Sequence, residues 1–228
     1  MRPAALSAVL FLSASLAACG GSEDQTAFQE GGGQDGADVL PVVRPGEGTL
    51  GEGEAIQLGP DFVDLQLGPA ITAGAGAVQT AQLTGAVGAA GEVSSYVACP
   101  VGVAACDPQE MSGATVYTYV AEVTPAIWTS VFRTANSVSG FTGTVGFDRE
   151  QAEAALGPDS ELAVRCVNGA LVWAVNGGQG WSGAPITVYW QSTSPPQTAE
   201  LAYQLVQGGA TVNAAGTIPS GDLDSACE

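Results

Sequence analysis

Leu162-Ala163-Val164-Arg165-Cys166-Val167 and Ala170-Leu171-Val172-Trp173-Ala174-Val175 flank the dipeptide Asn168-Gly169, and this stretch decides the fold. Asn-Gly between two such runs is the strongest short-range signal for a β-hairpin, because a type I′ turn needs a positive φ at both central residues. The turn also fixes the register and places Val164 opposite Trp173. We expect Arg165 and the alanines on the outer face. The core face then collects Leu162, Val164, Cys166, Leu171, Trp173 and Val175.

Short strand patterns continue on both sides of this hairpin, separated by turns rich in glycine and proline. Ile186–Trp190 alternates apolar and polar residues, as a half-buried strand does. Further strands are expected over Phe62–Leu67, Val78–Leu83, Val93–Cys99, Thr115–Val123, Ile127–Arg133, Phe141–Phe147 and Leu201–Val206. The pattern predicts an all-β fold, an antiparallel β-sandwich of immunoglobulin-like or jelly-roll type.

One short helix is expected over Asp148–Leu156. Asp148 can cap its first turn, Gln151 stands at the capping-box position, and Gly157-Pro158 ends the helical pattern. A helix of this length can bridge two strands at one end of a sandwich.

The composition excludes several classes of function. The 228 residues include 5 basic and 23 acidic side chains, for a net charge of −18, and no histidine. The basic residues are all arginines: Arg2, Arg44, Arg133, Arg149 and Arg165. Without histidine or lysine the chain has no Ser-His-Asp or Cys-His nucleophile, no histidine-ligated zinc and no lysine Schiff base. The charge argues against nucleic acid as a partner, and no cofactor is expected.

The N-terminus has the features of a secretory signal. An apolar stretch from Ala4 to Ala18 follows Arg2, is too short to span a bilayer as a helix, and ends in small residues. Its end, Leu16-Ala17-Ala18-Cys19, resembles the lipobox of bacterial lipoproteins. The resemblance implies cleavage before Cys19 and attachment of diacylglycerol and a further acyl chain, such as palmitate, to Cys19. Ordinary secretion, with Cys19 inside the discarded peptide, is the alternative.

That resemblance places the protein in the bacterial cell envelope, held by membrane lipid. Gly20 follows the cysteine, where an aspartate is the retention signal in enterobacterial members, and this implies the outer membrane. Residues 19–57 are rich in Gly, Glu, Asp and Gln and are expected to form a flexible, disordered acidic tether. Domain boundaries follow as signal peptide 1–18, tether 19–57 and β-sandwich 58–228.

Four cysteines remain if Cys19 is acylated, an even number in an exported chain, and this predicts two disulfides. Three pairings are possible. Cys99 and Cys106 flank a short loop and are the preferred local pair, which leaves Cys166 with Cys227. A metal site is not expected, because there is no Cys-x-x-Cys and no histidine.

Aromatic residues are the first candidates for ligand contact. Trp173 and Trp190 lie on expected core faces, whereas the position of Trp128 leaves its role open. Trp181 lies in the glycine-rich connection Gly177–Gly183, and an exposed indole there, with Tyr189, would suit a sugar or another partner. For Trp181 itself, a packing role with the ring folded back onto the domain is the favoured interpretation.

Carboxylates are the second candidates. Most lie at turns, but Glu122 and Glu200 fall in or near strands; Asp61 with Asp64, or Asp222 and Asp224 with Glu228, could offer oxygen ligands to calcium. Neither set fits a known calcium-loop pattern. The expected function is therefore non-enzymatic: an envelope binding or scaffold module whose partner is a glycan or an envelope protein. The alternatives are a carbohydrate-binding module and, less favoured, a carboxylate-based glycan hydrolase.

Overall fold

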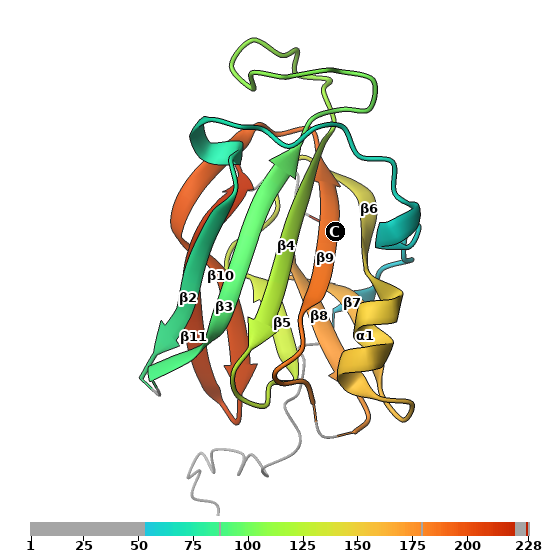
Figure 1. Ribbon diagram of the computed structural model, residues 1–228, viewed down its shortest axis with the longest axis vertical. Coiled ribbons are helices and arrows are strands. Elements are labelled where there is room, and N and C mark those ends of the chain that lie inside the picture. Colours follow the sequence, from blue (N-terminus) through green and yellow to red (C-terminus); the bar gives the residue numbers. More distant parts are fainter. Residues whose placement is uncertain (1–52, 87, 179, 222–226, 228) are drawn as a thin grey trace, which may run out of the picture. The chain divides into compact units, whose positions relative to one another are not determined.

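The computed structural model describes residues 53–86, 88–178, 180–221 and 227. These residues form one antiparallel sheet, three short helices and connecting loops (Figure 1). The strands are β1 (Glu54–Ala55), β2 (Gln79–Gly85), β3 (Gly88–Ala98), β4 (Tyr117–Pro125), β5 (Val131–Thr134), β6 (Phe141–Phe147), β7 (Glu161–Val167), β8 (Ala170–Asn176), β9 (Ile186–Ser192), β10 (Pro196–Gln207) and β11 (Ala210–Pro219). The helices are the 3₁₀ turns η1 (Phe62–Asp64) and η2 (Gly74–Gly76) and the α-helix α1 (Arg149–Leu156).

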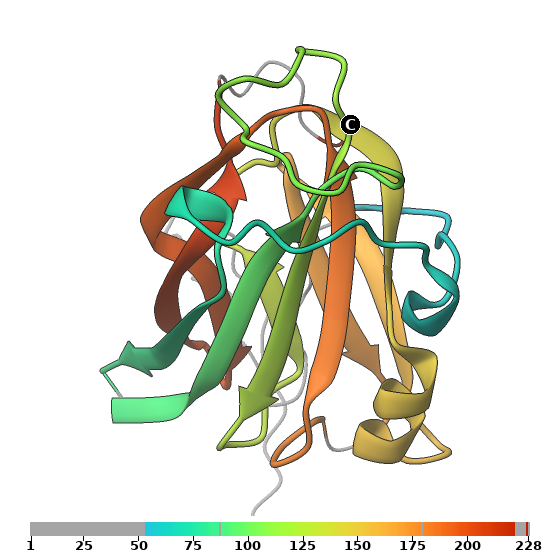
Figure 2. The ribbon, with the colours of Figure 1, turned by 45° about the horizontal axis from the view of Figure 1, so that its top comes forward.

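The sheet curls into a nearly closed barrel, so the predicted β-sandwich is wrong although the all-β class is right. The strand order is β1-β7-β8-β5-β10-β11-β2-β3-β4-β9-β6, and Figure 2 shows the ribbon wrapping around one interior. A sandwich would need a break into two sheets, but β5 pairs with both β8 and β10, and β11 continues the sheet to β2. Alternating burial marks a strand with one core face in either architecture, so it does not separate the two.

The β7–β8 hairpin forms as predicted. Val167 lies opposite Ala170 and Val164 opposite Trp173, and the turn residues Asn168 and Gly169 have φ values of 51° and 77°. Every residue of the expected core face belongs to the main hydrophobic core or packs against it. The outer face differs from the prediction in one respect. There Ala174 is buried, with Val131 and Val172, in a second small apolar cluster.

Aromatic side chains fill the barrel interior. Trp190 stacks on Tyr119 with ring centroids 5.4 Å apart, and Trp173 lies 5.9 Å from Trp190. Phe132 contacts both Trp173 and Tyr203. These five side chains have at most 1% of their surface exposed, so Trp173 and Trp190 have the packing role expected of them. The interior is a core, which is how small barrels are commonly filled.

One predicted strand is wrong, and the strands β1 and β11 were not predicted. Phe62–Leu67 forms the 3₁₀ turn η1 and an extended segment without a strand partner. The strand β11 is absent from the prediction because Ala210–Pro219 is rich in alanine, glycine, threonine and asparagine and shows little apolar alternation. Its burial depends on the long pairing with β10, which local sequence does not reveal.

A segment that we call the strap, residues 53–71, runs across the outside of the barrel (Figure 2). It begins with β1 beside β7, and the amide of Gly59 donates to the carbonyl of Val145 in β6. At its far end the amide of Ile71 donates to the carbonyl of Val97 in β3. Residues 53–57 were expected in the tether, yet in the structure they pack on the barrel.

Candidate functional site

The two ends of the sheet meet at a seam between β6 and β7, and the strap bridges it. The amide of Ile56 donates to the carbonyl of Val164 in β7 at 3.1 Å, and the amide of Gly59 donates to that of Val145 in β6 at 2.8 Å. In an antiparallel ladder alternate residues turn their N–H and C=O groups to the same side. Leu162 is two residues before Val164, so its backbone N–H and C=O groups also face the seam. Within the described residues no strand pairs with them, because β1 ends at Ala55.

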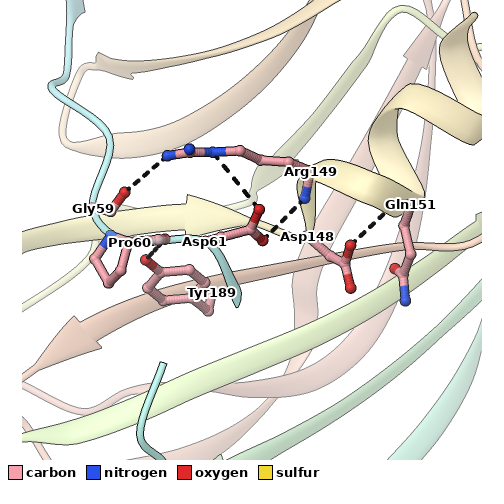
Figure 3. Close-up of polar contacts among 7 residues, drawn as sticks. All are labelled: Gly59, Pro60, Asp61, Asp148, Arg149, Gln151 and Tyr189. Atoms are coloured by element: carbon pink, nitrogen blue, oxygen red, sulfur yellow. Dashed lines mark hydrogen bonds and ion pairs between the residues drawn. The ribbon is translucent and has the colours of Figure 1, made fainter. Parts of the chain in front are cut away.

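A group of polar contacts, the clasp, holds the strap against the start of α1 (Figure 3). The Asp61 carboxylate accepts the backbone N–H of Arg149 at 3.2 Å, and its other oxygen lies 3.9 Å from Arg149 Nε. The Arg149 guanidinium also donates to the Gly59 carbonyl at 3.4 Å. The Tyr189 hydroxyl donates to the Pro60 carbonyl. A carboxylate at a helix N-terminus is favoured there by the unpaired amides and the helix dipole.

The start of α1 follows the predicted cap with one difference. Asp148 accepts the backbone N–H of Gln151 at 2.9 Å, as a capping residue should. The Gln151 side chain does not return to Asp148 to complete a capping box. Its oxygen accepts the backbone N–H of Thr187 in β9 at 2.7 Å, which ties the helix to the sheet. The carboxylates of Asp61 and Asp148 therefore both have structural partners.

Tyr189 belongs to this structural network and offers no ligand surface. Its side chain is 0% exposed and its ring packs against Phe62 in η1. Burial raises the pKa of Tyr189 to about 12, an effect to which Asp61 adds and which the Arg149 guanidinium partly offsets. The hydroxyl therefore stays protonated and keeps donating to the strap through the neutral range.

Trp181 is also buried. Its side chain is 0% exposed, its Nε1 donates to the Ala184 carbonyl at 2.8 Å, and its backbone pairs with Thr129. A sugar platform needs exposed rings, and neither Trp181 nor Tyr189 provides one. Trp128, whose role the sequence left open, is 53% exposed in the turn between β4 and β5.

A pocket of about 420 Å³ lies in the seam, between α1 and the start of β7. Its apolar lining comes from the strap, the end of β6, α1 and β7: Leu58, Phe147, Ala152, Leu156 and Leu162. Charged groups at the pocket are Arg149, Glu153 and Glu161, beside Ser160, Gly157 and Pro158. Sequence reasoning missed this site. One signal was available, because Arg149, Ala152, Glu153 and Leu156 stand at helical i, i+3, i+4 and i+7 spacing and share one face of α1.

The structure does not bring the predicted acidic candidates together. Glu122 is exposed on β4 and Glu200 is exposed on β10, and these strands are not neighbours in the sheet. Glu153 and Glu161 do line one pocket, but both are exposed to solvent.

The expected disulfides are present. Cys99 and Cys106 are joined, as are Cys166 and Cys227, over sequence separations of 7 and 61 residues. The proposed acylation site Cys19 lies outside the described residues, as do Asp222, Asp224 and Glu228 of one calcium hypothesis. Within the described part of the chain, no group of three or more Cys, Asp or Glu is placed to hold a metal ion.

Comparison with known proteins adds no assignment. No protein-family model matches the chain, and no curated protein or solved structure matches it. Among the helices that the structure describes, none is long and apolar enough to cross a membrane.

Proposed function

We propose that this chain is an exported, lipid-anchored binding module without enzymatic activity, which takes its ligand in the seam pocket. The pocket carries this proposal. Its volume of about 420 Å³ falls in the range of small-molecule sites, and it combines an apolar lining with a few charged groups. The barrel interior is filled by its own aromatic residues, so a ligand site is expected on the outside of the barrel.

The position of the pocket supports a binding role. It lies where β6 and β7 do not pair directly, so Leu58 of the strap comes together with Phe147 of β6 and Leu162 of β7. The carboxylates of Asp61 and Asp148 at the start of α1 accept backbone N–H groups, which suits a fixed frame for a ligand. A rigid rim reduces the entropy lost on binding.

Pocket binding can be tested with the chain carrying Cys19→Ser and a decyl-chain amphiphile below its micelle concentration. We expect amide shifts of Leu58, Ala152 and Leu162 in ¹H–¹⁵N spectra. Glu161→Trp, which places a large ring at the pocket, should abolish these shifts. Glu122→Trp makes the same change at an exposed strand position elsewhere and should preserve them. Equal binding by both variants would reject the pocket as the ligand site.

Membrane anchoring needs a separate experiment. The lipobox resemblance at Leu16-Ala17-Ala18-Cys19 supports it, because acyl chains contribute roughly 0.8 kcal/mol per buried methylene. The natural chain should sediment with membranes, and Cys19→Ser should move it to the soluble fraction. An unmodified Cys19 in mass spectra of the mature protein would reject the anchor.

A further inference from the structure

We infer that the seam pocket binds an amphiphilic cation, a small molecule with an apolar body and a positively charged head. The inference rests on the proposed function and adds the chemical class of the ligand. Its three supports are the apolar lining, the charges left unmatched at the rim and the charge of the whole chain.

The lining selects the body of the ligand. Phe147, Ala152 and Leu162 are buried, with 8%, 4% and 3% of their surfaces exposed, and they form the wall toward the core. Leu58 from the strap and Leu156 from α1 complete the apolar wall. Covering the apolar surface that remains accessible there with an alkyl or aryl group is favourable, because it removes that surface from water.

The rim selects the head of the ligand. Arg149 is the one basic residue lining the described pocket, and its positive charge is matched by the Asp61 carboxylate, 3.9 Å from its Nε. Glu153 and Glu161 are exposed, and neither has an ion-pair partner among the residues that the structure describes. Two unmatched carboxylates beside an apolar wall favour a cation over an anion.

The field of the chain acts in the same direction. The net charge is −18, so the surface attracts cations and repels anionic amphiphiles over the distance set by screening, about 10 Å at 0.1 M salt. Affinity for a cationic ligand should therefore fall as ionic strength rises. A neutral ligand of the same length should show little salt dependence.

Three decyl-chain probes test the inference with the Cys19→Ser chain: decyltrimethylammonium, decyl maltoside and decyl sulfate, all below micelle formation. We expect the cation to bind most tightly, with amide shifts confined to Leu58, α1 and the start of β7. The double variant Glu153→Gln/Glu161→Gln should weaken cation binding about fivefold to tenfold, since each exposed ion pair contributes modestly. The matched control Glu92→Gln/Glu122→Gln removes the same charge from β3 and β4 and should change affinity much less.

The outcomes separate the two levels of the proposal. Equal shifts of the pocket amides by all three probes would keep the pocket as a binding site and overturn the cationic class. An equal loss of affinity in the two double variants would also overturn it, because the effect would then come from net charge alone. Absence of pocket shifts with every probe would overturn both the site and its ligand class.

Discussion

The β7–β8 hairpin and the seam between β6 and β7 show two ways of joining strands in one barrel. The hairpin holds seven residues of each strand in register around a two-residue turn. At the seam, the described residues of β6 and β7 do not pair directly. The strap joins the two strands through the two-residue strand β1 and single backbone hydrogen bonds from Ile56 and Gly59. The clasp adds one ion pair and the Tyr189 hydrogen bond.

This difference indicates which part of the barrel contributes most to stability and which part has space for a ligand. Regular pairing leaves no space between strands, because neighbouring strands lie about 4.8 Å apart. At the seam β6 and β7 do not pair with each other, and a pocket lies between them. Perturbing the hairpin should therefore affect the whole fold, whereas perturbing the seam should have smaller and more local effects.

Removing the indole at the centre of the hairpin should have the largest effect. Trp173 is 0% exposed, so Trp173→Ala should lower the free energy of unfolding by about 3–5 kcal/mol, measured by urea denaturation. Trp128→Ala removes an indole that is 53% exposed and should cost about 0.5 kcal/mol or less. A similar loss in the free energy of unfolding for the two variants would contradict the inference that Trp173 stabilises the core.

The disulfides should differ in the same direction. Loop entropy predicts a loss of about 4 kcal/mol for Cys166→Ala/Cys227→Ala, which opens a link over 61 residues at the hairpin. Cys99→Ala/Cys106→Ala opens a link over only 7 residues and should cost about 2.5 kcal/mol. Thermal unfolding without reductant compares the two. A larger loss from the local pair would show that constraint of the unfolded chain is not the main contribution.

Weakening the clasp should affect the seam more than the hairpin. Asp61→Ala removes the carboxylate that accepts the Arg149 amide and should cost about 1 kcal/mol. Hydrogen exchange at the Gly59 amide should accelerate, while the amides that pair β7 with β8 should continue to exchange slowly. Asp64→Ala changes a neighbouring exposed acid and serves as the control. Equal acceleration throughout the barrel would mean that the strap does not open separately.

The smallest effect at neutral pH is expected for Tyr189→Phe, about 0.5–1 kcal/mol from the lost hydrogen bond. The contribution of Tyr189 to stability should also depend on pH. The folded pKa of about 12 exceeds the ordinary value of 10.0, so the unfolded chain releases this proton first as pH rises. This contribution to stability is complete below pH 10 and declines between pH 10 and 12. Urea titrations should show a shallower decline in Tyr189→Phe; an identical slope would remove Tyr189 as its source.

The sequence predicts features whose causes are local. Asn168-Gly169 defines the hairpin because its turn chemistry acts over four residues, and Asp148 marks the helix start for the same reason. Barrel closure depends on pairings between distant segments, such as β5 with β8 and β10, which carry no local signature. The sequence therefore reveals the strands more readily than their arrangement.

The position of Trp181 is hard to derive from sequence for a related reason, although its packing role was the favoured interpretation. A glycine-rich connection suggests an exposed Trp181, but its burial depends on pairing with Thr129 about fifty residues earlier in the chain. The pocket combines Leu58, Glu153 and Glu161 from the strap, α1 and β7. Only the helical face of α1 could have been recognised beforehand, and its spacing alone does not distinguish a pocket from ordinary packing.

The strap also has a consequence for the order of events during synthesis. Ile56 leaves the ribosome long before its partner Val164, and Gly59 long before Val145, so the barrel cannot be completed while the chain is still being made through β6. Contacts between such distant residues slow folding. The polypeptide should therefore remain incompletely folded until β7 to β11 are all available, because β10 and β11 join β5 to β2 in the sheet. A chain ending before Glu161 should not reach the native state.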